Sequence, residues 1–232
     1  MKTQLEKLNV VVRTGIEGNP RNVAREKPDV VIVATGAEPF LPGIKGVDGP
    51  HVVMAGEVLA GQADTGKEVV IIGGGAVGLE TALALARKGT IHPDTLHFLM
   101  FNQAESFATL NSLLYQGLKK ITVVEMLKTV GQDIGPSTRW TIRQDLARHS
   151  VKTLTNATAK EITAEGVIVD REGKTLLIRG DSVVLATGVK AVNTLYESLK
   201  ERVPEIYLIG DAKAPRKALE AIAEGLAVGR II

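Results

Sequence analysis

Residues 68–80, with the sequence EVVIIGGGAVGLE, decide the fold class of this chain. The first five residues are apolar or β-branched apart from Glu68, which predicts a buried strand. A glycine-x-glycine-x-x-glycine pattern follows at once, and the apolar spacing of Ala76–Lys88 predicts a helix after it. The order of strand, glycine turn and helix is typical of a Rossmann-like α/β unit.

Each glycine of this loop has a separate physical task. Gly73 permits the tight turn that leaves the strand, and Gly75 leaves room for a pyrophosphate to approach the backbone. Gly78 allows the helix to lie close to the sheet, and the N–H groups at the start of the helix attract phosphate. We therefore expect a dinucleotide site made by Gly73, Gly74, Gly75, Ala76, Val77 and Gly78.

A second marker of a dinucleotide site is an acidic residue at the end of the next strand. Ile121–Val124 is that strand, and Glu125 follows it directly. Its carboxylate can accept hydrogen bonds from the adenosine ribose, and its charge disfavours a 2′-phosphate, so we expect NAD(H) rather than NADP(H). The usual interval from the glycines is about 20 residues, and this one is longer. We assign the surplus to a helical insertion at residues 90–118.

The remaining pattern alternates apolar strands with helices and predicts the α/β class. Several strands are apolar on both faces, which is typical of a parallel sheet covered on both sides. Residues 151–178 instead predict a β-meander with a hairpin turn at Arg171–Lys174. The other expected strands are Asn9–Arg13, Asp29–Thr35, Ser182–Thr187 and Ile206–Ile209. The other expected helices are Lys2–Leu8, Pro93–Gln103, Glu105–Gly117, Pro136–His149 and Arg216–Ile231.

Proline and glycine are frequent between residues 38 and 50, which predicts a connection between domains. A second connection follows residue 188. We therefore predict a three-layer, Rossmann-like domain at residues 51–188, inserted into a second domain that residues 1–50 and 189–232 form together.

Composition excludes several classes of function. The 232 residues contain no cysteine, so this chain holds neither a redox-active cysteine pair nor a thiolate-bound iron–sulfur cluster. A formal net charge of +2 argues against nucleic acid, and no apolar run reaches the about 18 residues of a membrane span. The four histidines lack ligand spacing, so we expect no metal site. The first residues do not resemble a signal peptide, which predicts a cytoplasmic protein.

Three further sequence motifs are similar to those of a known family. Residues 34–36 and 186–188 both read Ala-Thr-Gly after an apolar strand, and residues 206–211 read IYLIGD. With the glycine loop, these turns make the chain resemble the pyridine-nucleotide-dependent flavoprotein reductases. That resemblance implies that the two threonine turns mark crossings between an FAD domain and an NAD domain, and that Asp211 bonds FAD. The site residues it implies are Thr35, Gly36, Thr187, Gly188, Gly210 and Asp211.

A narrower resemblance lies in residues 130–135, residues 212–222 and the helical insertion. These segments are similar to the C-terminal part of 2-enoate and 2,4-dienoyl-CoA reductases, which are NADH:flavin oxidoreductases of the old yellow enzyme group. The similarity implies that NADH passes hydride to FAD for reduction of an enoate or enoyl-CoA in another domain. It also implies that Glu80 lies near the nicotinamide carboxamide. We expect no catalytic nucleophile, acid or base in this chain.

Family members also have an FMN barrel with a cysteine-held cluster, and an FAD domain that opens with its own glycine loop. Neither has a counterpart in these residues, so residues 1–50 and 189–232 are expected to form an incomplete FAD-binding domain. We expect FAD in the intact family protein rather than in this chain alone. Two alternatives stay open, a non-catalytic nucleotide-binding protein and a subunit completed by a partner chain. An exposed apolar sheet edge would favour a homodimer.

Overall fold

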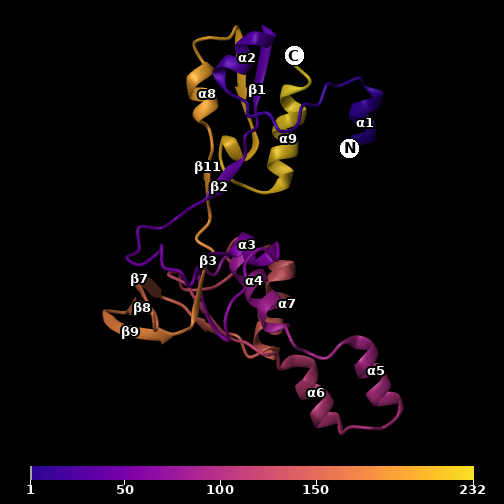
Figure 1. Ribbon diagram of the computed structural model, residues 1–232, viewed down its shortest axis with the longest axis vertical. Helices are drawn as coiled ribbons and strands as arrows, with labels where there is room; N and C mark the ends of the chain where they lie inside the picture. The colour runs from indigo at the N-terminus through magenta and orange to yellow at the C-terminus, as the bar shows by residue number, and fades with distance from the viewer. Residues whose placement is uncertain (1) are drawn as a thin grey trace. The chain divides into compact units, whose positions relative to one another are not determined.

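The computed structural model describes residues 2–232 and separates the chain into two compact units (Figure 1). Unit 1 combines the segment that ends at Glu38 with Val189–Ile232, and unit 2 is Pro39–Gly188. The glycine loop lies in unit 2. Within residues 2–232, no helix is both long enough and apolar enough to cross a lipid bilayer.

Unit 2 is built on a five-stranded sheet in which every neighbouring pair of strands is parallel. The strand order is β3-β10-β4-β5-β6, so β4 lies at the centre. Residues 69–72 of β4 are all buried, as their apolar character on both faces predicts. The strands are β3 (Val52–Met54), β4 (Glu68–Ile72), β5 (Lys120–Val124), β6 (Lys152–Leu154) and β10 (Ser182–Leu185).

Two hydrophobic clusters cover the two faces of this sheet. On one face Ile71 packs in a cluster with residues of α3 (Ala55–Leu59), α4 (Ala76–Ala86) and α7 (Pro136–Arg148). On the other face Val70 packs in a cluster with residues of the antiparallel meander. Figure 1 shows the meander and the helices on opposite sides of the sheet. The meander consists of β7 (Ala157–Thr163), β8 (Gly166–Arg171) and β9 (Lys174–Arg179). The predicted three-layer α/β class is therefore confirmed.

Local turn chemistry acts as the sequence predicts at two places in unit 2. The β8–β9 hairpin turns through Glu172 and Gly173, whose φ angles of 54° and 77° are left-handed. Such angles at both central residues are those of a type I′ turn. Helix α7 begins at Pro136, with Gly135 as the residue that precedes the first turn.

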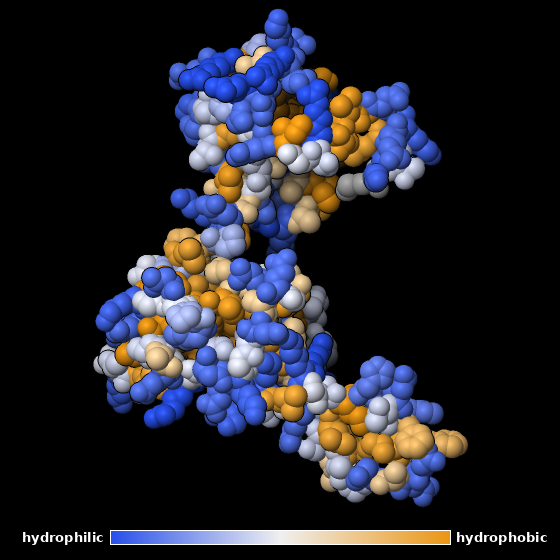
Figure 2. Space-filling view, viewed as in Figure 1, coloured by the Kyte–Doolittle hydropathy of each residue, from blue (hydrophilic) through white to orange (hydrophobic). Residues whose placement is uncertain are grey.

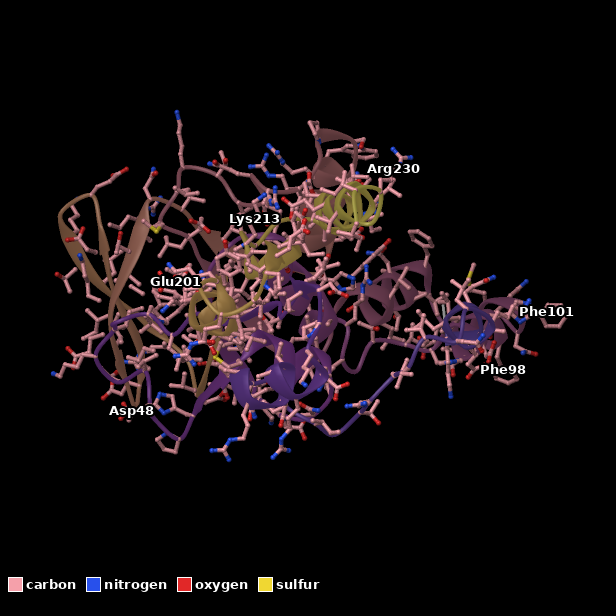
Figure 3. The ribbon with its side chains drawn as sticks, turned by 90° about the horizontal axis from the view of Figure 1, so that it is seen from above. Asp48, Phe98, Phe101, Glu201, Lys213 and Arg230 are labelled. Atoms are coloured by element: carbon pink, nitrogen blue, oxygen red, sulfur yellow. The ribbon has the colours of Figure 1, made fainter. Side chains whose placement is uncertain are left out.

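A helical insertion separates α4 from β5. It consists of α5 (Pro93–Phe101) and α6 (Phe107–Tyr115), and it lies within the predicted range 90–118. Ile91 N donates to Leu113 O within the insertion, and Leu118 N donates to Lys88 O, which ties the end of the insertion to the segment that precedes it. Apolar side chains gather on its surface (Figure 2). Phe98 and Phe101 are 61% and 78% exposed and project outward in Figure 3.

Unit 1 contains little sheet. Strand β1 (Val30–Val33) pairs in parallel with β12 (Glu205–Leu208), and β2 (Ala37–Pro39) pairs with β11 (Val189–Ala191). The 3₁₀ turn η1 (Gly210–Ala212) follows β12. The helices of this unit are α1 (Lys2–Lys7), α2 (Pro20–Glu26), α8 (Thr194–Leu199) and α9 (Ala218–Val228).

One predicted strand is wrong. Asn9–Arg13 is not part of a strand, and Val10, Val11 and Val12 are 48%, 78% and 60% exposed. β-branched residues favour a strand only where a neighbouring strand supplies backbone partners and a surface to pack on. Among residues 2–232, β1 pairs with β12 alone, so Asn9–Arg13 has joined neither edge of this sheet.

Candidate nucleotide-binding site

The glycine loop joins β4 to α4 through a turn in which two glycines are sterically required. Gly73 has a left-handed φ of 112°, and a Cβ there would lie 2.2 Å from the backbone oxygen of Ala186. A Cβ at Gly78 would lie 2.0 Å from the oxygen of Gly73, so α4 approaches the loop closely only with glycine at this position. Both roles agree with those predicted for a Rossmann-like loop.

Gly75 is different, because neither its backbone angle nor a backbone contact requires glycine. It precedes α4 with a φ of −75°, which any residue adopts. A Cβ there would meet only the Asp133 carboxylate, with the nearest oxygen at 3.2 Å. At the helix N-terminus, where a phosphate would be attracted, the missing side chain thus leaves space whose nearest neighbour is an exposed carboxylate. The residues present fit a dinucleotide in this respect.

Glu125 lies against the glycine loop, as its position after β5 predicts. Its side chain is buried, and its Oε2 accepts a hydrogen bond of 2.6 Å from Gly74 N. Its Oε1 accepts one of 2.8 Å from Leu127 N. The carboxylate thus braces the loop, a role that sequence reasoning did not assign to it. A carboxylate has about four lone-pair sites, so two hydrogen bonds leave capacity for ribose hydroxyls.

Asp133 is a site residue that sequence reasoning missed. Its Oδ1 and Oδ2 lie 3.1 and 2.9 Å from Ala76 N, the first N–H of α4. The backbone beside it is tied to the loop, because Gly131 N donates to Gly74 O at 2.7 Å. The signals in the sequence were the family-like segment 130–135 and an acidic residue shortly before the proline that begins α7. That pattern does not reveal a partner 57 residues away.

The two Ala-Thr-Gly turns have similar hydrogen bonds. In unit 2, Thr187 Oγ1 donates to Phe40 O at 2.7 Å, and Phe40 N donates to Gly188 O at 3.0 Å. The turn borders the glycine loop, because Ala186 N donates to Ile72 O.

In unit 1, Thr35 Oγ1 donates to Val192 O, and Val192 N donates to Gly36 O at 3.0 Å. Both threonines therefore fasten one chain segment to another within their own unit.

The other two predicted positions on α4, Val77 and Glu80, are exposed.

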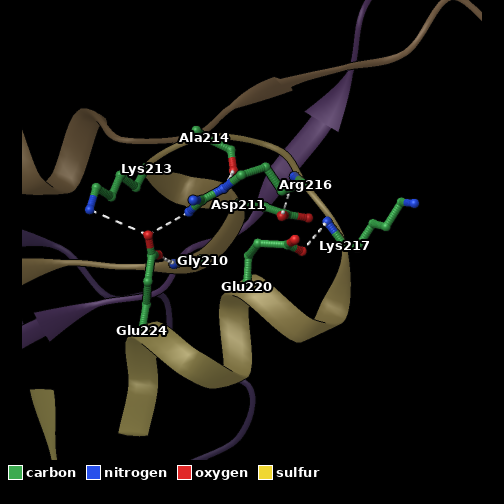
Figure 4. A network of polar contacts seen from close by, with 8 residues as sticks. All are labelled: Gly210, Asp211, Lys213, Ala214, Arg216, Lys217, Glu220 and Glu224. Carbon is green, nitrogen blue, oxygen red and sulfur yellow. Dashed lines mark hydrogen bonds and ion pairs between the residues drawn. The ribbon is translucent and has the colours of Figure 1, made fainter. Parts of the chain in front are cut away.

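Gly210 and Asp211 lie in unit 1 at the end of β12, in a network of charged side chains (Figure 4). Gly210 N donates to Glu224 Oε2 at 2.7 Å, and Arg216 N donates to Asp211 Oδ1 at 3.1 Å. Glu224 also binds the Arg216 guanidinium at 2.5 Å and lies 3.3 Å from Lys213 Nζ. The hydrogen bond from Arg216, and then that from Gly210, lower the pKa of Glu224 to about 2. Sequence reasoning missed Glu224, because nothing in a helical pattern marks which carboxylate turns back to a preceding strand.

The predicted site residues thus fall into two groups. Unit 2 brings together the glycine loop, Glu125 and the turn at Thr187, and unit 1 holds the turn at Thr35 and the Gly210–Asp211 pair. Among residues 2–232, no three histidine, aspartate or glutamate side chains are grouped so that they could hold a metal ion.

Comparison with known proteins gives consistent results. Residues 4–225 match the family described as pyridine nucleotide-disulphide oxidoreductase. The chain is 45% identical over 219 residues to a metal reductase of Desulforamulus reducens, covering 93% of this chain and 33% of the relative. It is 34% identical over 234 residues to an NADH oxidase of Thermoanaerobacter brockii, covering 98% and 32%. A solved 2-naphthoyl-CoA reductase complex has a TM-score of 0.79 at 30% identity, covering 100% and 31%. The chain spans about a third of the length of these relatives.

Proposed function

The chain belongs to the pyridine nucleotide-disulphide oxidoreductase family, and from this premise we propose that it is the NADH-binding module of a flavin-dependent oxidoreductase. The expected resemblance to pyridine-nucleotide-dependent flavoprotein reductases is confirmed, and so are the cofactors, NAD(H) and, in the intact family protein, FAD. The narrower placement in the old yellow enzyme group belongs to the proposal.

The observation that carries the proposal is the N-terminus of α4 at Gly75, where a Cβ would meet no backbone atom among its nearest contacts. Helix α4 contains 11 residues, and its dipole attracts a pyrophosphate to its N-terminus, where an exposed carboxylate, that of Asp133, bonds the first N–H. Residues 73–78 would hold that group, and Glu125 would accept hydrogen bonds from the adenosine ribose. Glu80 would lie near the nicotinamide carboxamide.

When bound, NADH supplies a hydride and FAD accepts it. The residues of this chain act by binding and orientation, and we assign no catalytic acid, base or nucleophile to them. The predicted domain at residues 51–188, which lies within unit 2, is the part that binds NADH. The second predicted domain, residues 1–50 and 189–232, would contribute part of an FAD site through Thr35, Gly36, Gly210 and Asp211, all of which lie in unit 1.

Reduction of an enoate or enoyl-CoA would take place in another part of a longer protein. The similarity to a 2-naphthoyl-CoA reductase supports this class of substrate, because that protein's name specifies an aromatic acyl thioester. An FMN and iron–sulfur domain, or a partner chain, would complete the electron path. The alternative is a nucleotide-binding subunit that transfers no electrons by itself.

Calorimetric titration with NADH and NADPH, after a visible spectrum for bound flavin, tests the proposal. We expect NADH binding that Gly75→Val abolishes and that Glu125→Ala weakens about tenfold, since both changes act at the loop. Gly43→Val is the matched control, because a Cβ at Gly43 meets nothing within 4 Å. Equal NADH affinity of Gly75→Val and the unmodified chain would contradict the proposed site. A chain that binds neither nucleotide would favour a purely structural subunit.

A further inference from the structure

Asp133 occupies the place where the proposed function puts the pyrophosphate. We propose that Asp133 is an internal competitor for the nucleotide phosphate: its carboxylate binds the N-terminus of α4 in the free chain and leaves it when NADH binds. This inference rests on the proposed function of the glycine loop. It adds a residue that sets the affinity for NADH without belonging to the glycine motif.

The geometry places the carboxylate directly on a phosphate-binding donor. Both oxygens of Asp133 lie within 3.1 Å of Ala76 N, and one lies 3.2 Å from the point where a Cβ of Gly75 would be. The space that Gly75 leaves open is therefore the space that Asp133 fills. An anionic oxygen at the first N–H of a helix is favoured for the same reason as a phosphate oxygen.

Asp133 can leave this position, whereas Glu125 cannot do so easily. The Glu125 side chain is 8% exposed and holds two backbone N–H groups, so its removal would leave a buried charge without partners. The Asp133 side chain is exposed, so its carboxylate can be hydrated as soon as it leaves Ala76 N. Of the two carboxylates at the loop, Asp133 is the one that can be exchanged for a ligand.

The backbone on either side of Asp133 stays fixed during such an exchange. The Arg139 guanidinium donates to Gln132 O at 3.0 Å and to Ile134 O at 2.7 Å. Val130 is buried, and Gly131 N donates to Gly74 O. The exchange therefore needs only rotation of one side chain, and residues 130–135 need not unfold.

Competition follows from the charges. The phosphate and Asp133 are both anions, and both are attracted to the same positive end of α4. Binding of NADH must break the contact between Asp133 and Ala76. The negative charge of Asp133 then remains near the bound phosphate and repels it. Removal of the carboxylate should therefore strengthen nucleotide binding. It should also lower the stability of the ligand-free protein, because the first N–H of α4 loses its hydrogen-bond acceptor.

The test is calorimetric titration of the whole chain with NADH, together with thermal unfolding without ligand. For Asp133→Ala we expect NADH to bind about threefold to tenfold more tightly, since a charge-assisted hydrogen bond no longer has to be broken. We expect its unfolding midpoint to fall by about 2–4 °C. Asp133→Asn removes the charge and keeps an acceptor, so its gain in affinity should be smaller. ADP-ribose, which has the pyrophosphate and lacks nicotinamide, should show the same gain.

Asp170→Ala is the matched control. Asp170 Oδ1 also accepts a backbone hydrogen bond, from Gly173 N at 3.1 Å, but in the β8–β9 turn. This variant removes the same charge and a similar cap, so it should lower the unfolding midpoint and leave NADH affinity unchanged. A gain in affinity as large as that of Asp133→Ala would mean that net charge alone is responsible, and would overturn the inference.

The remaining outcomes separate the two proposals. If the unmodified chain binds NADH, Gly75→Val does not, and Asp133→Ala binds no more tightly than the unmodified chain, the competition is refuted and the site stands. If Asp133→Ala lowers both affinity and stability, Asp133 has a structural role only. If the unmodified chain, Gly75→Val and Asp133→Ala all fail to bind NADH and ADP-ribose, the proposed function fails, and the inference fails with it.

Discussion

Strands β4 and β1 have similar sequences and very different surroundings. Both are short, β-branched strands in a parallel pairing. Strand β4 has a neighbour on each edge and a hydrophobic cluster on each face, and its Ile71 is 0% exposed. Strand β1 has β12 as its single neighbour among residues 2–232, and its Ile32 is 42% exposed. The same kind of sequence is therefore buried from Val69 to Ile72 in β4, whereas in β1 only Val33 is fully buried.

The contrast extends to the helices. Helix α4 buries Leu79, Leu83 and Leu85 against the sheet of unit 2. Helix α9 in unit 1 exposes Leu219, Ile222 and Leu226 by 74%, 65% and 55%. Those three residues follow a helical spacing that normally faces a core. Unit 2 thus has a hydrophobic core of its own, whereas unit 1 leaves much of its apolar surface exposed to solvent.

The comparison is tested most strongly by one substitution in each strand. Ile71→Ala should lower the free energy of unfolding of unit 2 by about 3–4 kcal/mol, because it leaves a cavity in a closed core. Ile32→Ala should cost less than about 1 kcal/mol, since its side chain is already partly in water. Amide hydrogen exchange of β4 and β1 measures each unit separately. Equal losses would contradict the contrast between the units.

A substitution at the glycine loop should have a somewhat smaller effect. Gly78→Ala places a Cβ 2.0 Å from Gly73 O, and relief of this clash should cost about 3 kcal/mol in unit 2. The emission of Trp140, the only tryptophan, can follow this unfolding in urea. Gly56→Ala is the control, because a Cβ there meets nothing within 4 Å and alanine favours the helix. A Gly78→Ala chain as stable as Gly56→Ala would mean that α4 can move away from the loop without cost.

The smallest effect on stability is expected in unit 1, from protonation of Glu224 at low pH. Contact with Arg216 lowers the pKa of Glu224 from 4.5 to about 2, so the folded state holds the charged form more strongly than the unfolded state. The stabilisation is complete above pH 4.5 and is lost as the pH falls towards 2. Glu224→Gln should lower the melting temperature at pH 7, and this difference from the unmodified chain should shrink below pH 4.5. Circular dichroism melts across that range measure it, and a difference that is constant with pH would refute the charge-based explanation.

The sequence predicted those structural elements around the candidate site that depend on neighbours along the chain. The strand–glycine–helix order of residues 68–80, the Glu172–Gly173 turn and the start of α7 at Pro136 follow from backbone preferences of a few adjacent residues. The position of Glu125 beside the glycine loop was predictable because the end of a parallel strand is a fixed position in this class of fold.

Only the tertiary structure decided which side chains meet those elements. Asp133 reaches Ala76 across 57 positions, and Glu224 reaches Gly210 across 14, and each pairing depends on how separate elements pack. The exposure of Val11, in a segment whose residue types favour a strand, has the same origin. A residue type sets what a backbone prefers locally, whereas burial and hydrogen-bond partners depend on which distant segments lie beside it.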